Sequence, residues 1–265
     1  MPDLRLASLH VYPIKSCGGL SPADWDVDDF GLRHDRRWMI VTAGGDFVTQ
    51  REQPRLALVR PELSDGSLVL RAPGMPELTL PVIPASRKRI KVQVWGDITE
   101  GVPVGPEAAQ WLSRYLGELV QLVWMPNDVI RQTDPDYALG HRVSYADGFG
   151  FLLIGAASLA ELNRRLEKPL PMNRFRPNLV VSGAEPFAED EWRELRLGAL
   201  ELTVVKPCAR CVTTTTDQDT AERGVEPLKT LATFRKRNGK VMFGQNLVHR
   251  GTGRVAVGAP VQVVS

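Results

Sequence analysis

The chain has 265 residues, of which 43% are hydrophobic and 24% are charged, so a disordered or fibrous protein is excluded. Its 33 basic and 31 acidic residues leave a net charge of +2, which disfavours binding to nucleic acid through bulk charge. Three cysteines cannot form a closed disulfide framework, and no apolar run reaches signal-peptide length or the roughly 18 residues of a membrane span. We therefore expect a cytoplasmic protein with no membrane and no nucleic-acid partner.

Short apolar runs separated by turn residues dominate the first 120 residues and predict the strands of a barrel or sandwich. These runs are 4–12, 38–41, 56–59, 68–70, 78–82 and 90–95. Tight turns are expected at 43–46 (AGGD) and 65–66 (DG). The alternation of apolar residues in the first run slips by one between Leu6 and Leu9, which predicts a β-bulge.

Three segments carry helical signals. The first spans 106–117, between a proline that suits a helix start and a glycine that suits a helix end. The second begins with a capping box formed by Ser158 and Glu161. The third spans 226–239, with the basic residues 235–237 as its cationic last turn.

The second half of the chain is again rich in strand signals. Its apolar runs are 151–154, 179–182, 195–205 and 254–264. A polar segment without periodicity, 127–140, predicts a long loop between the two halves. The predicted fold class is therefore mainly β with a few helices (α+β).

The most distinctive local feature is the segment KPCARC at 206–211, which a valine and four threonines follow. A structural zinc site needs about four ligands, and no second paired motif supplies them. A redox dithiol usually opens a helix, whereas the β-branched residues after Cys211 favour a strand. Two small buried side chains at a strand end remain an alternative. In another alternative, one thiolate binds a soft metal whose other ligands come from a cofactor, while Lys206 and Arg210 lower the thiol pKa.

An anionic cofactor would need cationic and polar anchors, and four other segments offer them. They are 12–19 with Lys15 and Ser16, 34–38 with Arg36, 144–148 with Asp147, and 173–178 with Arg176 and Asn178. Each segment also has a purely structural interpretation: a surface turn, an ion pair with Asp35, an Asx-turn or a capped strand edge. The basic cluster at 87–91 is expected to be a charged edge strand.

Several segments in order resemble one family. They are YPIKSCGG, GLRHDRRWMIV, VTQREQPRLALV, NRFRPNLVVSG, KPCARCVTTTTDQDT and FGQNLV. From residue 9 to residue 263, the chain resembles MOSC-domain proteins with an N-terminal β-barrel domain, such as the YcbX-like proteins and the mitochondrial amidoxime-reducing components. The resemblance implies a β-barrel-like MOSC N-terminal domain at 1–125, whose opening strand can pack with the second domain. It implies a MOSC distorted β-barrel at 140–265.

The resemblance also implies a molybdenum cofactor, Mo-molybdopterin. The second cysteine of the C-x-R-C pair, Cys211, is then the catalytic residue and the metal ligand, while Cys208 is structural or lies nearby. Relatives often carry a serine where this chain has Ala209, so a hydroxyl contact is lost there. The implied cofactor-binding residues are Lys15, Ser16, Arg36, Asp147, Arg176, Asn178 and Arg210.

The activity implied by the resemblance is reduction of small N-hydroxylated or N-oxygenated compounds. Electrons would come from a separate flavoprotein reductase or iron–sulfur protein. One alternative is a cofactor carrier or sulfur-handling protein without substrate turnover. Another is a nucleic-acid or partner-binding barrel that uses the basic cluster at 87–91.

Overall fold

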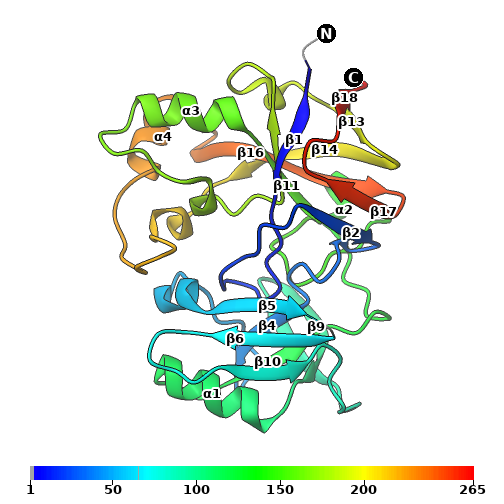
Figure 1. The fold of residues 1–265 in the computed structure, drawn as a ribbon, viewed down its shortest axis with the longest axis vertical. Coiled ribbons are helices and arrows are strands. Elements are labelled where there is room, and N and C mark those ends of the chain that lie inside the picture. Colours follow the sequence, from blue (N-terminus) through cyan, green and yellow to red (C-terminus); the bar gives the residue numbers. More distant parts are fainter. Residues whose placement is uncertain (1–2, 65) are drawn as a thin grey trace.

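The computed structural model describes residues 3–64 and 66–265, which form two β-rich lobes (Figure 1). The strands are β1 (Arg5–Leu9), β2 (Asp24–Asp28), β3 (Gly31–Leu32), β4 (Trp38–Thr42), β5 (Arg60–Ser64), β6 (Ser67–Arg71), β7 (Leu78–Pro81), β8 (Ile90–Val94), β9 (Asp97–Pro103), β10 (Val120–Trp124), β11 (Phe151–Gly155), β12 (Leu179–Ser182), β13 (Glu194–Leu197), β14 (Leu200–Ala209), β15 (Lys236–Arg237), β16 (Lys240–Arg250), β17 (Gly253–Ala256) and β18 (Val261–Val263). The helices are α1 (Pro106–Leu116), α2 (Pro135–Ala138), α3 (Ala156–Arg164) and α4 (Leu228–Phe234), with 3-10 turns η1 (Pro54–Leu58), η2 (Met172–Arg174), η3 (Ala188–Asp190) and η4 (Val212–Thr215). The predicted class, mainly β with a few helices, is confirmed.

The upper lobe in Figure 1 is built on an eight-stranded sheet, in which β15 pairs with β16 beside the path β1-β12-β11-β16-β14-β13-β18. A bridge between Arg5 and Pro260, together with the bond from Val261 N to Leu4 O (2.9 Å), brings β18 back toward β1 and nearly closes a barrel. Strand β1 pairs antiparallel with β12, so the start of the chain lies in the sheet of the second half. Its register shifts between Leu6 and Ser8, which confirms the predicted bulge.

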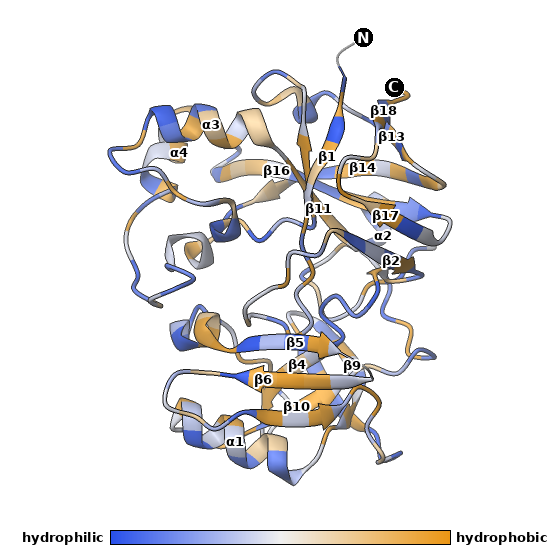
Figure 2. Ribbon diagram, in the orientation of Figure 1, coloured by the Kyte–Doolittle hydropathy of each residue, from blue (hydrophilic) through white to orange (hydrophobic). Residues whose placement is uncertain are grey.

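The lower lobe contains the sheet β4-β10-β9-β8 and the sheet β5-β6-β7. Helix α1 covers them with the apolar face that includes Trp111 and Leu112, and it ends as predicted at Gly117, whose φ is 76°. Figure 2 shows the hydrophobic colour along β6 and β10 and the hydrophilic colour on parts of α1. A third small sheet, β17-β2-β3, lies on the side of the upper lobe.

Two predictions about local structure were wrong, the strand at 56–59 and the helix cap at Ser158. Residues 56–59 do not form a strand, because Pro54 opens the 3-10 turn η1, which buries Leu56. Ser158 is not a helix cap: α3 already begins at Ala156, and the buried Ser158 hydroxyl donates to Glu189 (2.8 Å). Tertiary contacts with a distant carboxylate therefore replaced the expected capping box.

The third predicted helix is also shorter than expected, since α4 ends at Phe234. Strand β15 forms a hairpin with the start of β16, and its turn residues Asn238 and Gly239 both have positive φ (48° and 76°). Asn-Gly is a strong hairpin signal, and here it prevails over the helix-end interpretation. Arg235 and Arg237 bind the Asp190 carboxylate instead of capping a helix.

The remaining predicted runs need smaller corrections. Runs 195–205 and 254–264 each split into two strands, β13 with β14 and β17 with β18. The turn at 43–46 is confirmed by the bond from Thr42 N to Asp46 O (2.9 Å), whereas Asp65 of the other predicted turn lies outside the described residues. Within 3–64 and 66–265, none of the helices has the length and apolar character needed to cross a bilayer.

Candidate functional site

The residues singled out from the sequence converge on one cavity of about 150 Å³, to which both lobes contribute. Those that line it are Lys15, Ser16, Arg36, Asp147, Arg176, Asn178, Arg210 and Cys211. Arg51 and Arg174 line the same cavity and were not among the predicted site residues. Residues more than 150 positions apart in the sequence therefore line the same cavity.

Three of these residues adopt a backbone conformation that non-glycine residues rarely take. Ser16, Arg36 and Arg176 have φ of 69°, 50° and 54°. Such conformations cost on the order of 1 kcal/mol each and persist where the surrounding structure enforces them, which is typical of functional sites. The strain at these three positions is therefore in keeping with a functional cavity, although other residues such as His34 and Asn238 also have positive φ.

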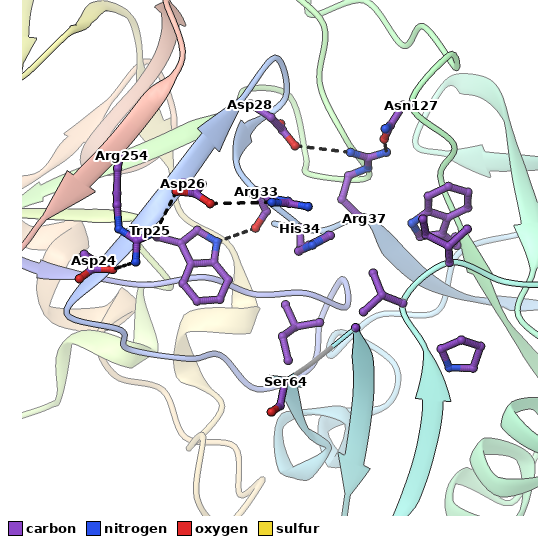
Figure 3. A pocket seen from close by; sticks show the side chains of 16 residues that line it. Asp24, Trp25, Asp26, Asp28, Arg33, His34, Arg37, Ser64, Asn127 and Arg254 are labelled. Carbon is purple, nitrogen blue, oxygen red and sulfur yellow. Dashed lines mark hydrogen bonds and ion pairs between the residues drawn. The ribbon is translucent and has the colours of Figure 1, made fainter.

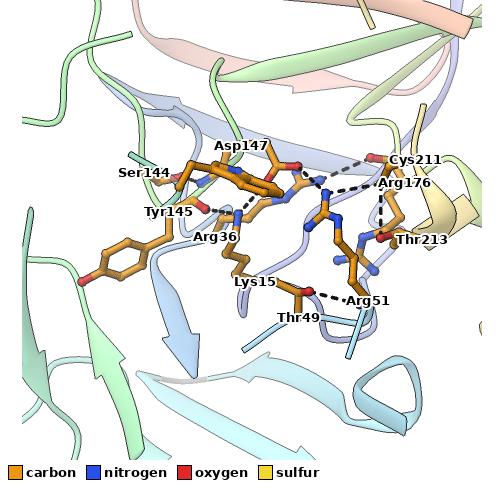
Figure 4. A network of polar contacts seen from close by, with 12 residues as sticks. Lys15, Arg36, Thr49, Arg51, Ser144, Tyr145, Asp147, Arg176, Cys211 and Thr213 are labelled. Carbon is orange, nitrogen blue, oxygen red and sulfur yellow. Dashed lines mark hydrogen bonds and ion pairs between the residues drawn. The ribbon is translucent and has the colours of Figure 1, made fainter. Parts of the chain in front are cut away.

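Lys15 and Asp147 form an ion pair at one wall of the cavity (Figure 4). The Lys15 ammonium is buried and donates to Tyr145 O (2.8 Å) and to the Asp147 carboxylate (2.5 Å). Burial lowers the pKa of Lys15, and Asp147 opposes that shift. For Asp147, desolvation works to raise the pKa, but the charges of Lys15 and Arg51 outweigh it and lower the pKa well below its usual range. The carboxylate is therefore ionised at neutral pH, and its side chain remains 63% exposed.

Arg36 and Arg176 meet over one aromatic ring. Their guanidinium carbons lie 4.3 and 4.2 Å from the centroid of the Tyr12 ring. Arg36 is held by Asp35 (2.5 Å) and by Asn178 Oδ1 (3.2 Å), so the expected ion pair with Asp35 exists, although Asp35 is buried. Arg176 has one side-chain hydrogen bond within the described chain, a long one to Gln218 (3.4 Å). Burial lowers the pKa of Arg176 to about 10, and the charge of Arg36 contributes to the shift. Two converging cations with one nearby carboxylate form a wall suited to an anion.

Asn178 holds other residues in place rather than presenting free polar groups. Its Oδ1 accepts from Leu152 N (3.1 Å) as well as from Arg36, and its Nδ2 donates to His10 O (3.2 Å). The amide therefore joins the end of β1, the strand β11 and the Arg36 guanidinium. Its place at the cavity is consistent with a role in positioning Arg36.

Cys211 ends the extended segment after β14 and lies at the N-terminus of η4. The strand expected after it is therefore wrong: the threonines form a 3-10 turn whose hydroxyls bond to backbone carbonyls, such as Thr214 Oγ1 to Cys211 O (2.9 Å). The Cys211 Sγ lies 3.4 Å from Thr213 Oγ1. Small polar side chains that bond their own backbone favour such turns over strands.

Arg51, which sequence reasoning missed, is the cation beside Cys211. Its Nη2 donates to Cys211 Sγ (3.2 Å) and lies 3.7 Å from the Asp147 carboxylate. Burial raises the pKa of Cys211, but the hydrogen bond to Thr213 and the charge of Arg51 outweigh it, so the pKa is lowered. The thiolate is thus favoured at this position, as binding of a soft metal requires.

The expectation that Arg210 and Lys206 activate Cys211 was wrong in its geometry. Arg210 donates to the other thiol, Cys208 Sγ (3.0 Å), and to Phe175 O (2.5 Å), while its Nε is buried without a partner in the described chain. The Lys206 ammonium lies over the Tyr137 ring, 4.0 Å from its centroid. The third thiol, Cys17, is fully buried, and burial raises its pKa to about 12.

A glutamine pair and an arginine support the segment around Cys211. Gln50 and Gln218 donate to each other (3.2 and 3.0 Å), and Gln50 also donates to Ser16 O (2.6 Å). Arg174 is buried and holds Thr215 O (3.0 Å) and Asp217 (2.9 Å). These contacts tie the predicted anchor segment at 12–19 to the loop that carries Cys211.

The charge of the cavity decides what it can hold. Its cations are Lys15, Arg36, Arg51, Arg174, Arg176 and Arg210, against one described lining carboxylate, that of Asp147. In the part of the chain that the structure describes, no group of three or more His, Cys, Asp or Glu side chains could hold a metal ion. Cys208 and Cys211 both line the cavity, and the Cys211 thiolate among these cations fits an anionic cofactor that brings further ligands to a soft metal.

A larger cavity of about 710 Å³ lies elsewhere and contains none of the predicted cofactor residues (Figure 3). Its charged groups are paired with one another: Arg254 binds Asp24 and Asp26, and Arg37 faces Asp28 (3.8 Å). The larger cavity therefore presents no concentrated charge to a ligand.

Comparisons with known proteins agree with these observations. Residues 3–119 match the family model of the MOSC N-terminal beta barrel domain, and residues 140–262 match that of the MOSC domain. The chain is 38% identical to mitochondrial amidoxime reducing component 2 of Rattus norvegicus, over 97% of this chain and 82% of that protein. It is 36% identical to mitochondrial amidoxime-reducing component 1 of Homo sapiens, over 98% of this chain and 82% of that protein.

Among solved structures, the YUAD protein of Bacillus subtilis is similar with a TM-score of 0.46 and 11% identity, over 98% of this chain and 97% of that one. The chain therefore belongs to the family of MOSC-domain proteins with a MOSC N-terminal beta barrel domain, the family of the mitochondrial amidoxime-reducing components.

Proposed function

We propose that this protein is a molybdenum-cofactor-dependent oxidoreductase that reduces N-hydroxylated compounds and takes electrons from a separate protein. The observation that carries the proposal is the Cys211 thiol, held by Arg51 in a cavity with six lining cations. Membership of a family whose relatives are named as amidoxime-reducing components supports this chemistry.

The residues of the cavity fit the cofactor by charge and by ligand type. Cys211 would bind the molybdenum, because a thiolate is a soft ligand. Lys15, Arg36 and Arg176 would bind the phosphate and the polar edge of the pterin. Two N–H groups of the Lys15 ammonium are used within the described chain, by Tyr145 O and Asp147, which leaves the third for an anion. When bound, the cofactor would supply the two-electron oxygen-transfer chemistry that protein side chains lack.

The chain's own residues would keep the reacting centre in one geometry. Arg51 holds Cys211 through a charge-assisted contact and at the same time faces Asp147. Reduction of an N-hydroxy group consumes two electrons and two protons and releases water. Lys15 Nζ, whose pKa is lowered by burial, is a proton-bearing group at the cavity wall, and Asp147 fixes its position.

The electrons would come from a separate flavoprotein reductase or iron–sulfur protein. The sequence contains three cysteines, which is fewer than the four that usually hold an iron–sulfur cluster. Of these, Cys17 is buried and Cys211 is assigned to the molybdenum. The proposal therefore assigns no cluster to these three cysteines.

The test is reduction of hydroxylamine and benzamidoxime by protein purified from a host that makes the molybdenum cofactor, with reduced methyl viologen as the electron source. We expect turnover by the wild type and none by Cys211→Ser. Cys208→Ser is the matched control, because it removes a thiol of the same motif, and it should keep both metal and activity. Wild-type turnover by Cys211→Ser would refute the assignment of that thiol. Molybdenum-loaded wild type that reduces neither compound would favour a cofactor carrier instead.

A further inference from the structure

Trp95 occupies an unusual place in the backbone. It is the first of the two residues that join β8 to β9, where Val94 pairs with Asp97, and its φ is 56°. Hairpin turns of this length normally place glycine, asparagine or aspartate at positive φ, because a bulky side chain is strained there. Ser16, Arg36 and Arg176 share this backbone feature and all line the candidate cavity. Other residues with positive φ, such as His34 and Asn238, do not line that cavity, so the contacts of the Trp95 side chain decide where it acts.

The contacts of the Trp95 ring lead directly to the residues around Cys211. The Arg51 guanidinium lies over the ring, 4.4 Å from its centroid, and the ring Nε1 donates to Asp147 Oδ1 (3.3 Å). Phe47 packs edge-on at 5.0 Å between ring centroids. Arg51 and Asp147 both line the cavity, so the ring lies at its rim.

The ring is held on several sides, but it is not covered. Trp95 remains 43% exposed, which is high for the largest apolar side chain when it already has three partners. Asp147 beside it keeps 63% of its side-chain surface exposed and is ionised at neutral pH. The rim thus offers an open aromatic surface next to an open hydrogen-bond acceptor, while the deeper cavity is cationic.

We propose that Trp95 is a specificity-determining residue that binds the planar aromatic part of N-hydroxylated substrates at the rim, beside Asp147. This inference rests on the proposed function. An arylamidoxime matches both rim groups, because its aryl ring can stack on the indole and its amino group can donate to the Asp147 carboxylate. A small substrate such as hydroxylamine has no ring and gains nothing from Trp95.

Benzamidoxime takes up two electrons and two protons, its N–O bond breaks, and the products are benzamidine and water. Reduced methyl viologen supplies the electrons and the buffer supplies the protons. Trp95 takes no part in these steps and acts only on binding.

The experiment compares the wild type with Trp95→Ala and Trp95→Phe, using benzamidoxime and hydroxylamine as alternative substrates of the cofactor-loaded enzyme. For Trp95→Ala we expect KM for benzamidoxime to rise about five- to tenfold, the loss expected for one aromatic pair, with kcat nearly unchanged. The KM for hydroxylamine should stay within about twofold of the wild-type value. Binding of benzamidine, measured by titration calorimetry, gives a readout independent of turnover, and its Kd should rise together with KM. Trp95→Phe keeps a ring face and should restore most of the affinity.

Ile98→Ala is the matched control, because Ile98 is in the same hairpin and is 74% exposed. It should leave both substrates unaffected. An equal loss for benzamidoxime and hydroxylamine in Trp95→Ala would overturn the inference, since Trp95 would then only hold Arg51. Unchanged kinetics for both substrates, or an effect of Ile98→Ala as large as that of Trp95→Ala, would also overturn it. Failure of the wild type to reduce either compound would instead refute the proposed function, so the two failures are distinguishable.

Discussion

Replacement of Arg51 by alanine tests whether this residue, rather than the arginine inside the C-x-R-C motif, sets the state of Cys211. The Arg51 Nη2 lies 3.2 Å from Cys211 Sγ, and its side chain is 23% exposed. Arg51→Ala removes the positive charge and leaves the hydrogen bond to Thr213 in place. We therefore expect the pKa of Cys211 to rise from its lowered value.

The size of the effect follows from the distance between the two groups. Opposite unit charges about 3.2 Å apart attract each other by about 1.3 kcal/mol even with the dielectric constant of water. That free energy corresponds to about one unit of pKa. At a pH below both pKa values, Arg51→Ala should therefore hold about tenfold less thiolate than the wild type.

Alkylation of cofactor-free protein by iodoacetamide measures this difference, because the thiolate is the reactive form. The rate is followed against pH by mass spectrometry. Trypsin cleaves after Arg210 and so separates Cys208 from Cys211. The buried Cys17, whose pKa is raised to about 12, should react slowly throughout.

Arg55→Ala is the matched control. Arg55 also lies over an aromatic ring, 4.5 Å from the centroid of Tyr115, but it has no contact with Cys211 in the described structure. It should leave the alkylation profile of Cys211 unchanged. The reasoning is refuted if Arg51→Ala has the wild-type profile, or if Arg210→Ala shifts the profile while Arg51→Ala does not.

Three further predictions concern the metal, the cofactor and the fold. Cys211→Ser should lose molybdenum while Cys208→Ser retains it, because a serine hydroxyl is a hard, poorly ionised ligand. Elemental analysis of both variants measures the difference. The reverse pattern would assign Cys208 as the metal ligand. Arg176→Ala should lower the pterin content severalfold. It should change Tm by less than about 2 °C, because the Arg176 side chain has one long hydrogen bond in the described protein. An equal pterin content in the wild type and the variant would exclude Arg176 as an anchor. Gly101→Ala should lower the free energy of unfolding by about 1–3 kcal/mol in urea titrations, because the added Cβ would lie 2.5 Å from the Tyr145 hydroxyl. A variant as stable as the wild type would contradict this prediction, because the packing around Gly101 would then relax without cost.

Local sequence signals predicted those elements whose ends are determined locally. Helix α1 lies between Pro106 and Gly117, and β12 matches its apolar run at 179–182. The bulge in β1 was visible as a slip in apolar alternation. Partners distant in sequence decided the failures: Glu189 binds Ser158, which was expected to cap a helix, and Asp190 binds the arginines expected in a last helical turn.

In the candidate site, too, contacts between residues distant in sequence could not be predicted. Arg51 lies in the segment VTQREQPRLALV, and nothing local distinguishes it from Arg55 four residues later. Only the fold brings Arg51 between Trp95 and Cys211. Conversely, the adjacency of Arg210 to Cys211 in sequence was misleading, because successive residues of an extended segment point to opposite sides, and Arg210 lies on the side of Cys208. The cytoplasmic location stays a prediction, and the relatives named above are mitochondrial proteins.

Elemental analysis of the purified protein for molybdenum and zinc, together with the fluorescence of the oxidised pterin, tests the central claim most directly. The host must make the cofactor, and Cys211→Ser is purified in parallel. We predict about one molybdenum and one pterin per chain in the wild type, as one cysteine ligand implies, and little molybdenum in the variant. Zinc without pterin in the wild type would contradict the claim and make the C-x-x-C pair part of a zinc site.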